Sequence, residues 1–305
     1  MGIMKKKEII IELSNKCNLN CSMCGFGNTK QKQNNFMSFD MYKNILSKIH
    51  DKTNSIRFNG RGEQTIHPQF SEIITWTKTN YPELKLALNT NGMYDTDCNI
   101  LKDMQLYISI DSLTQQGLNI MRSGADLIKI MGNIRNLHRN PKPCIIFTLQ
   151  EYNMNDVDII SIADYCAKNN LNLMYNYYCS EGDNYTRYFK KLLILTSQIN
   201  KCFNYVINTY SNKIEDLRVP DLISGVVPVI NDKTIKTIKQ GAICKYCYEG
   251  LFILYNGDVN PCGQMNPVHL GNIITDEFET FASHEFLKIK HPKTNYCEDC
   301  SNIMA

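Results

Sequence analysis

The chain has 305 residues, enough for one sizeable domain with a small appendage. With 43% hydrophobic and 21% charged residues, its composition excludes a disordered or fibrous protein. The net charge of +3 comes from 33 basic and 30 acidic residues, so no strong field of one sign predicts binding to nucleic acid or to a membrane surface. The apolar run that follows the basic residues 5–7 is too short for a signal peptide or a membrane span, and we therefore expect a cytoplasmic protein.

Short apolar runs alternate with segments of helical periodicity over the first 180 residues. Strands are expected at 8–13, 55–58, 84–88, 106–110, 144–149 and 171–177. Helices are expected after Ser38, a residue of the N-cap type, and from Asn155 onward. Six βα repeats of this kind predict an α/β fold with a parallel sheet, and such sheets bind ligands at the carboxyl ends of their strands.

The pattern changes after residue 180. Residues 184–212 carry the apolar stripe of one long helix, and a Pro- and Gly-bearing connector follows. Residues 251–255 and 258–260 flank Asn256-Gly257, a pair that favours the left-handed turn of a hairpin. We therefore expect a core at 1–215, a connector at 216–243 and a C-terminal domain at 244–305.

Thirteen cysteines are present, and their odd number excludes a complete set of intramolecular disulfides. Reduced thiolates that hold metal fit better. Eight cysteines fall into two tight groups. The other five lie scattered among apolar stretches and are expected to be small buried side chains: Cys98, Cys144, Cys166, Cys179 and Cys202.

The first group, Cys17-x3-Cys21-x2-Cys24, directly follows the first expected strand. Three thiolates can hold one face of an iron–sulfur cluster but leave one iron open; a zinc site completed from elsewhere is the alternative. The spacing and its place resemble the radical S-adenosylmethionine superfamily. That resemblance implies that a 4Fe-4S cluster binds S-adenosylmethionine at its open iron and reduces it to a 5′-deoxyadenosyl radical, which abstracts a hydrogen atom from substrate.

The same resemblance extends to three motifs. Gly60-Arg61-Gly62-Glu63-Gln64 stands where the family has Gly-Gly-Glu-Pro, with Arg61 and Gln64 departing from that pattern. Ser109-Ile110-Asp111 resembles the family's Ser-x-Asp, and Asp111 is alternatively the cap of the next helix. Arg122 lies near a family arginine and is alternatively a solvent-facing helix residue. The resemblance thus implies cofactor contacts, but no catalytic acid or base, at Gly60, Gly62, Glu63, Ser109, Asp111 and Arg122.

The second group surrounds the expected hairpin and resembles the SPASM or twitch extension of the same superfamily. This resemblance implies an auxiliary 4Fe-4S cluster on Cys244, Cys262, Cys297 and Cys300, with Cys247 as an alternative ligand. Structural zinc is the alternative, because two C-x2-C pairs are the spacing of a zinc ribbon. The two resemblances together imply a partial (β/α)6 TIM-like barrel with a small C-terminal cysteine-rich β-hairpin/helix extension.

These resemblances imply an oxidoreductase, in which the auxiliary cluster either accepts an electron in a net oxidation or helps to position the substrate. We expect a small-molecule substrate, a sugar or aminocyclitol alcohol, because the first strand begins near Met1 and leaves no room for a fused leader-binding module. Crosslinking or epimerisation of a ribosomally made peptide is the alternative, and a non-catalytic zinc or iron–sulfur protein is the alternative of another class. The expected electron donor is a flavodoxin or ferredoxin. Tyr175, Tyr177, Tyr178 and Cys179 are expected either to line the substrate pocket or to belong to the core.

Overall fold

The computed structural model describes residues 8–24, 35–138, 140–177, 183–220, 250–261 and 269–282. These residues form two compact units. Residues 8–17, 35–88, 250–261 and 269–282 belong to the first unit, and the remaining described residues belong to the second. The first unit therefore combines the start of the chain with its C-terminal part, whereas the expected domains at 1–215, 216–243 and 244–305 stay a prediction.

The first unit contains a mixed sheet in the order β12-β11-β10-β1-β3-β4. Its strands are β1 (Glu8–Ile11), β3 (Ser55–Phe58), β4 (Lys85–Thr90), β10 (Gly250–Ile253), β11 (Asp258–Asn260) and β12 (Gly271–Asn272). The four strands from β10 to β4 are parallel, and β11 and β12 are added antiparallel. Ile9 of β1 lies between Leu251 of β10 and Ile56 of β3, so the C-terminal hairpin extends the parallel sheet.

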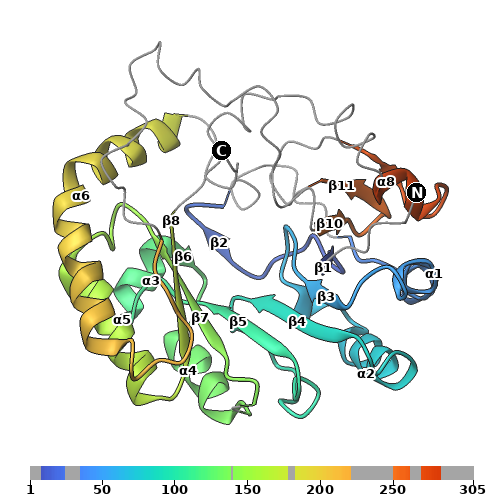
Figure 1. Cartoon of the computed structure of the whole chain (residues 1–305), viewed down its shortest axis with the longest axis horizontal. Helices are drawn as coiled ribbons and strands as arrows, with labels where there is room; N and C mark the ends of the chain where they lie inside the picture. The colour runs from blue at the N-terminus through green and yellow to red at the C-terminus, as the bar shows by residue number, and fades with distance from the viewer. Residues whose placement is uncertain are drawn as a thin grey trace. The chain divides into compact units, whose positions relative to one another are not determined.

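Helices α1 (Phe39–Ile49) and α2 (Phe70–Asn80) lie beside β3 and β4 (Figure 1). The expected cap is confirmed, because the Ser38 hydroxyl accepts a hydrogen bond from the Met41 amide at 3.2 Å. Tyr42 and Phe58 are fully buried, with ring centroids 6.2 Å apart, and such contacts fix the helices on the sheet. Two short helices, η1 (Gln64–Ile66) and α8 (Phe278–Ala282), complete this unit's described elements.

The expected hairpin is present, but its turn differs from the expectation. Leu254 donates its amide to the Asp258 carbonyl at 2.8 Å, so three residues form the loop. Only Gly257 in this loop has a positive φ, at 86°. The turn is therefore a three-residue loop with a left-handed glycine rather than a two-residue turn with both residues left-handed.

The second unit contains a parallel sheet in the order β5-β7-β8-β9. Its strands are β5 (Gln105–Ser109), β7 (Cys144–Leu149), β8 (Asn172–Tyr177) and β9 (Leu217–Arg218), and a separate antiparallel pair consists of β2 (Asn20–Cys21) and β6 (Arg122–Ser123). Its helices are α3 (Gln115–Met121), α4 (Leu127–Asn136), α5 (Asp156–Lys168) and α6 (Asp183–Tyr210). Helices α5 and α6 lie side by side along β7 and β8 (Figure 1).

Tyr175 lies in the core of this unit. Its ring packs against Phe147 and Phe203, with centroids 5.6 and 5.1 Å away, and its hydroxyl donates to the Ile159 carbonyl at 2.6 Å. The interpretation of Tyr175 as a residue of the substrate pocket is therefore wrong, and the alternative that it belongs to the core is confirmed. Tyr177 is partly exposed, while Tyr178 and Cys179 lie outside the described residues.

The scattered cysteines follow the expectation in part. Cys144, Cys166 and Cys202 are buried, as predicted, but Cys98 is partly exposed, because it lies in the loop after β4 rather than in a strand or helix. Among the described residues, we find no helix with the length and apolar character of a membrane span.

Candidate functional site

Cys17, Cys21 and Cys24 follow β1, and each is a partly exposed residue that forms no disulfide. Cys21 lies in β2, and the Cys24 amide donates to the Cys21 carbonyl at 3.1 Å, which makes a tight turn between these two cysteines. In the described part of the chain no three His, Cys, Asp or Glu side chains are gathered as a finished metal site. Reduced, accessible thiols are nevertheless the donors that an iron–sulfur cluster requires, so these residues fit the predicted group.

Gln64 fixes the backbone that leads to Cys17. Its side chain is fully buried, and its amide oxygen accepts hydrogen bonds from the amides of Leu13 and Ser14 at 2.6 and 3.0 Å. Its amide nitrogen donates to the carbonyls of Ser14 and Gly62 at 3.1 and 2.9 Å. The residue that replaces the family's usual proline therefore ties the loop after β1 to the turn after β3.

The two predicted glycines are required by close packing inside the first unit. A Cβ atom on Gly62 would lie 2.2 Å from the Lys16 carbonyl oxygen, and one on Gly60 would lie 2.5 Å from the Glu12 side chain. The neighbouring Glu63 is buried, donates its amide to the Lys16 carbonyl at 2.8 Å and accepts from the Thr65 hydroxyl at 2.7 Å. The turn thus holds the segment before Cys17, while direct contact of these residues with a cofactor stays a prediction.

Glu12 is a buried acid directly after β1 that was not among the predicted residues. One carboxylate oxygen accepts from the Arg61 amide at 2.6 Å, and the other has no hydrogen-bond partner in the structure as far as it is described. Burial raises the pKa of Glu12 to about 7, although the hydrogen bond from the Arg61 backbone lowers it. An orphaned oxygen of this kind marks a polar position at the carboxyl end of β1.

The segment with Cys21 is held by the opposite strand of its small sheet. Cys21 pairs with Arg122, and Asn20 with Ser123. Next to this pair, the amide and hydroxyl of Ser22 donate to the Met121 carbonyl at 3.0 and 3.3 Å. Two of the three predicted cluster ligands therefore lie in, or one turn after, a strand fixed to residues 121–123.

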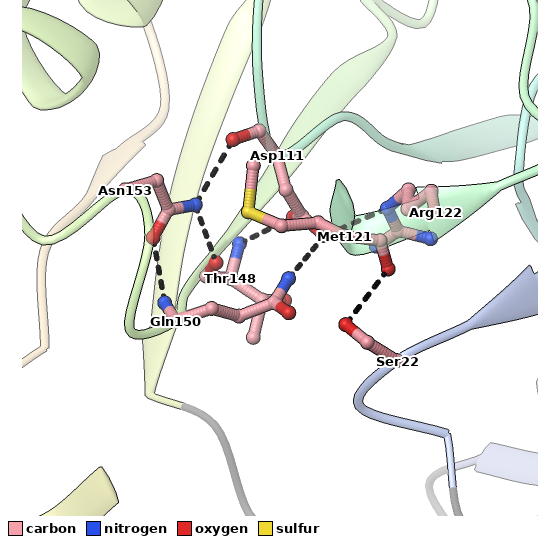
Figure 2. Close-up of polar contacts among 7 residues, drawn as sticks. All are labelled: Ser22, Asp111, Met121, Arg122, Thr148, Gln150 and Asn153. Carbon is pink, nitrogen blue, oxygen red and sulfur yellow. Dashed lines mark hydrogen bonds and ion pairs between the residues drawn. The ribbon is translucent and has the colours of Figure 1, made fainter. Parts of the chain in front are cut away.

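Asp111 lies at the centre of a buried polar network in the second unit (Figure 2). One carboxylate oxygen accepts from the Thr148 amide at 2.9 Å, and the other accepts from Gln150 Nε2 at 2.8 Å and Arg122 Nε at 2.7 Å. Thr114, rather than Asp111, caps α3 by accepting from the Gly117 amide, so the cap reading of Asp111 is wrong. Asp111 lies ahead of the helix, with its carboxylate turned into the protein.

Arg122 and Ser109 occupy different surroundings. Arg122 is 6% exposed and lies in β6, so its reading as a solvent-facing helix residue is wrong. Ser109 is partly exposed at the end of β5, where a ligand-binding residue of a parallel sheet is expected. The predicted cofactor contacts of Ser109, Asp111 and Arg122 stay predictions.

Sequence reasoning did not select Glu12, Gln64, Gln150 or Asn153. Glu12 could have been noticed in the sequence, because an acidic residue inside the apolar run Ile9–Leu13 is unusual at the end of a buried strand. Gln64 was visible only as a departure from the family's proline. Gln150 and Asn153 gave no signal, because their importance comes from the distant Asp111 that they contact.

The second cysteine group, Cys244, Cys247, Cys262, Cys297 and Cys300, lies outside the described residues. Its place in the sequence can be compared with known families. Residues 244–301 match the SPASM iron–sulfur cluster-binding domain, and residues 11–166 match the Radical SAM superfamily.

Part of the chain is also similar to a curated protein. The chain is 30% identical over 115 residues to the tungsten-containing aldehyde ferredoxin oxidoreductase cofactor-modifying protein of Pyrococcus furiosus, a match that covers 35% of this chain and 31% of that protein. The matched part thus spans about a third of the length of this curated relative.

Two solved structures share the fold. SuiB of Streptococcus suis, bound to S-adenosylmethionine, matches with a TM-score of 0.71 at 18% identity. The match covers 97% of this chain and 71% of the SuiB chain. The structure of anSMEcpe with bound AdoMet matches with a TM-score of 0.63 at 18% identity. That match covers 96% of this chain and 86% of the anSMEcpe chain. The predicted α/β fold, a partial (β/α)6 barrel with a C-terminal extension, is confirmed by these matches and by the parallel pairing within each unit.

Proposed function

Because the chain belongs to the radical S-adenosylmethionine superfamily, we propose that it cleaves S-adenosylmethionine reductively and abstracts a hydrogen atom from a substrate. The observation that carries this proposal is the set of three partly exposed cysteines outside any disulfide, Cys17, Cys21 and Cys24, directly after β1 and inside the matched residues 11–166. The alternative of a non-catalytic metal protein does not account for a ligand set that leaves one iron open.

The cofactors of this family are S-adenosylmethionine and 4Fe-4S clusters. Cys17, Cys21 and Cys24 would hold the first cluster, which when reduced supplies the electron that splits S-adenosylmethionine and yields the 5′-deoxyadenosyl radical. The predicted residues that would bind S-adenosylmethionine are Gly60, Gly62, Glu63, Ser109, Asp111 and Arg122. An auxiliary cluster, with zinc as the alternative, would be held by Cys244, Cys262, Cys297 and Cys300, with Cys247 as an alternative ligand.

The protein's own contribution is to fix the ligands before the cofactor binds. Gln64 and Gly62 hold the backbone on the N-terminal side of Cys17, through contacts within the first unit. The pairing of β2 with β6 holds Cys21 within the second unit. A preorganised ligand loop lowers the entropic cost of assembling the site.

The substrate class is a narrower proposal. The small-molecule expectation depended on the position of the first strand near Met1, which says nothing about a separate leader-binding chain. A peptide substrate is supported by SuiB, which has also been solved bound to its precursor peptide SuiA. We therefore place a ribosomally made peptide first and a sugar or aminocyclitol alcohol second. Crosslinking of the peptide or oxidation of the alcohol would be a net two-electron oxidation, whereas epimerisation of the peptide would not. A flavodoxin or ferredoxin would be the electron donor.

The test is to purify the chain without oxygen, reconstitute iron and sulfide, and compare it with a Cys17→Ala, Cys21→Ala, Cys24→Ala triple variant. About eight irons per chain falling to about four, with 5′-deoxyadenosine formed only by the unmodified chain, is the result expected for two 4Fe-4S clusters. A Cys202→Ala variant is the matched control, because Cys202 is a buried cysteine that should leave the iron content unchanged.

Other outcomes separate the parts of the proposal. About four irons with one zinc would keep the radical chemistry and make the C-terminal site structural. Zinc without any nucleoside product would overturn the proposal. A product that has lost two hydrogen atoms, formed from a short peptide encoded beside this gene but not from an aminocyclitol, would support the peptide substrate; the reverse result would support the small molecule.

A further inference from the structure

The buried network around Asp111 joins the end of β7 to the strand opposite Cys21 (Figure 2). Asp111 is fully buried, and the side chain of Arg122 is 7% exposed. The two charges are in contact at 2.7 Å between Asp111 Oδ2 and Arg122 Nε. Because a buried charge is stable only when paired and hydrogen-bonded, the position of Arg122 depends on Asp111.

Two amide side chains hold Asp111 in turn. Gln150 Nε2 donates to the carboxylate at 2.8 Å, and the backbone amide of Gln150 donates to Asn153 Oδ1 at 2.6 Å. Asn153 Nδ2 donates to the carbonyls of Asp111 and Thr148 at 2.9 and 3.0 Å. These bonds fix the orientation of the carboxylate, and Arg122 donates to the same oxygen as Gln150.

Arg122 is directly opposite Cys21 in the antiparallel pair of β2 and β6. Side chains of directly opposed residues project from the same face of a sheet, with Cβ atoms about 4.5–5.5 Å apart. The guanidinium held by Asp111 and the thiol of Cys21 therefore share one face. The contacts of Ser22 with the Met121 carbonyl keep the two strands in this register.

We propose that Asp111, Gln150 and Asn153 are positioning residues that hold the Arg122 cation beside Cys21, where its charge sets the reduction potential of the cluster. This inference rests on the proposed function, because it presupposes a cluster on Cys21. A fixed positive charge favours the reduced, more negative cluster, and the Asp111 carboxylate offsets part of that effect. Asp111 thus acts on the cluster through Arg122.

The test is an EPR-monitored redox titration of the reconstituted holoenzyme without S-adenosylmethionine. The relevant cluster is identified separately as the one whose spectrum changes when S-adenosylmethionine is added. Asp111→Asn releases Arg122 and also removes the offsetting carboxylate, so it should lower the ratio of reduced to oxidised cluster at fixed potential by less than Arg122→Met does, roughly threefold. Arg122→Met should lower that ratio roughly tenfold, which is about 59 mV for a one-electron couple.

Two further variants serve as controls. Arg122→Lys keeps the positive charge and should stay within about threefold of the unmodified chain. Asp95→Asn breaks the exposed ion pair with Lys129 in the same unit and should leave the potential unchanged.

Shifts in opposite directions for Asp111→Asn and Arg122→Met, or no shift in either at full iron content, would overturn the inference. If Asp111→Asn does not fold, the Arg122 variants still test the inference. Equal reduction potentials of the cluster in Arg122→Lys and Arg122→Met would overturn it. A holoenzyme that shows no spectral change with S-adenosylmethionine would instead overturn the proposed function, together with the inference that rests on it.

Discussion

The side chain of Gln64 uses all four of its hydrogen-bonding positions on backbone groups of one unit. Gln64→Leu leaves these buried groups without partners, and we expect the free energy of unfolding to fall by roughly 3 kcal/mol. Fluorescence of Trp76, the single tryptophan, follows urea unfolding of the first unit. Gln69→Leu, on an exposed glutamine nearby, should change the free energy by less than about 0.5 kcal/mol, and equal effects of the two variants would refute the role of Gln64.

The raised pKa of Glu12 predicts a pH dependence of stability. Because the folded-state pKa of about 7 lies above the ordinary value of 4.5, the carboxyl group stabilises the fold fully below pH 4.5, and this contribution is lost as the pH rises through 7. Between pH 6 and pH 8.5, the contribution of Glu12 to the free energy of unfolding of the unmodified chain should fall by roughly 1–2 kcal/mol.

A Glu12→Gln variant should lack this loss. The loss between the two pH values is measured within each variant, which removes any constant cost of the amide. Subtracting the loss of one variant from that of the other then removes the contributions of other titrating groups. Glu72→Gln, on the exposed side of α2, is the control and should keep the pH dependence of the unmodified chain. If the Glu12→Gln variant lost as much stability between the two pH values as the unmodified chain, Glu12 would not be the group responsible.

At the scale of elements, the turn between β10 and β11 depends on Gly257. Its φ of 86° is unfavourable for other residues, and a Cβ atom there would lie 2.9 Å from the Asn272 side chain. Gly257→Ala should therefore destabilise the protein by about 1–2 kcal/mol. Circular dichroism in urea measures the effect.

Gly132 provides a control of opposite sign. It lies inside α4 and a Cβ atom there would meet only the end of the Arg135 side chain, at 3.9 Å. Gly132→Ala should stabilise the protein by about 0.5–1 kcal/mol. Destabilisation by both substitutions would show that the positive φ of Gly257 is not the cause.

Elements with a local signal could be predicted from the sequence. The strands at Ser55–Phe58 and Cys144–Leu149 have the expected bounds, and the caps at Ser38 and Asn155 hold their helices, because propensity and capping depend on neighbouring residues. The parallel pairing of β1 with β10 could not be predicted, because it joins residues about 240 positions apart. The networks of Gln64 and Asp111 escaped prediction for the same reason, since every partner of Asp111 is distant in sequence.

For the whole molecule, this pairing means that the start of the chain depends on its C-terminal part. Ile9 and Ile11 are fully buried, and the Glu12 amide donates to the Ile253 carbonyl at 2.8 Å. A chain of residues 1–243 would lack β10 and leave β1 as an exposed apolar edge.

We therefore expect this truncated chain to aggregate or to lose iron from the first cluster, although it retains Cys17, Cys21 and Cys24. The matched control is the full-length chain with alanine at Cys244, Cys247, Cys262, Cys297 and Cys300, which keeps the hairpin. That variant should bind about four irons and still form 5′-deoxyadenosine, because it loses only the auxiliary ligands. Iron content and 5′-deoxyadenosine are measured after anaerobic reconstitution of both chains. A soluble 1–243 chain with about four irons and nucleoside formation would show that β10 is dispensable for the first cluster.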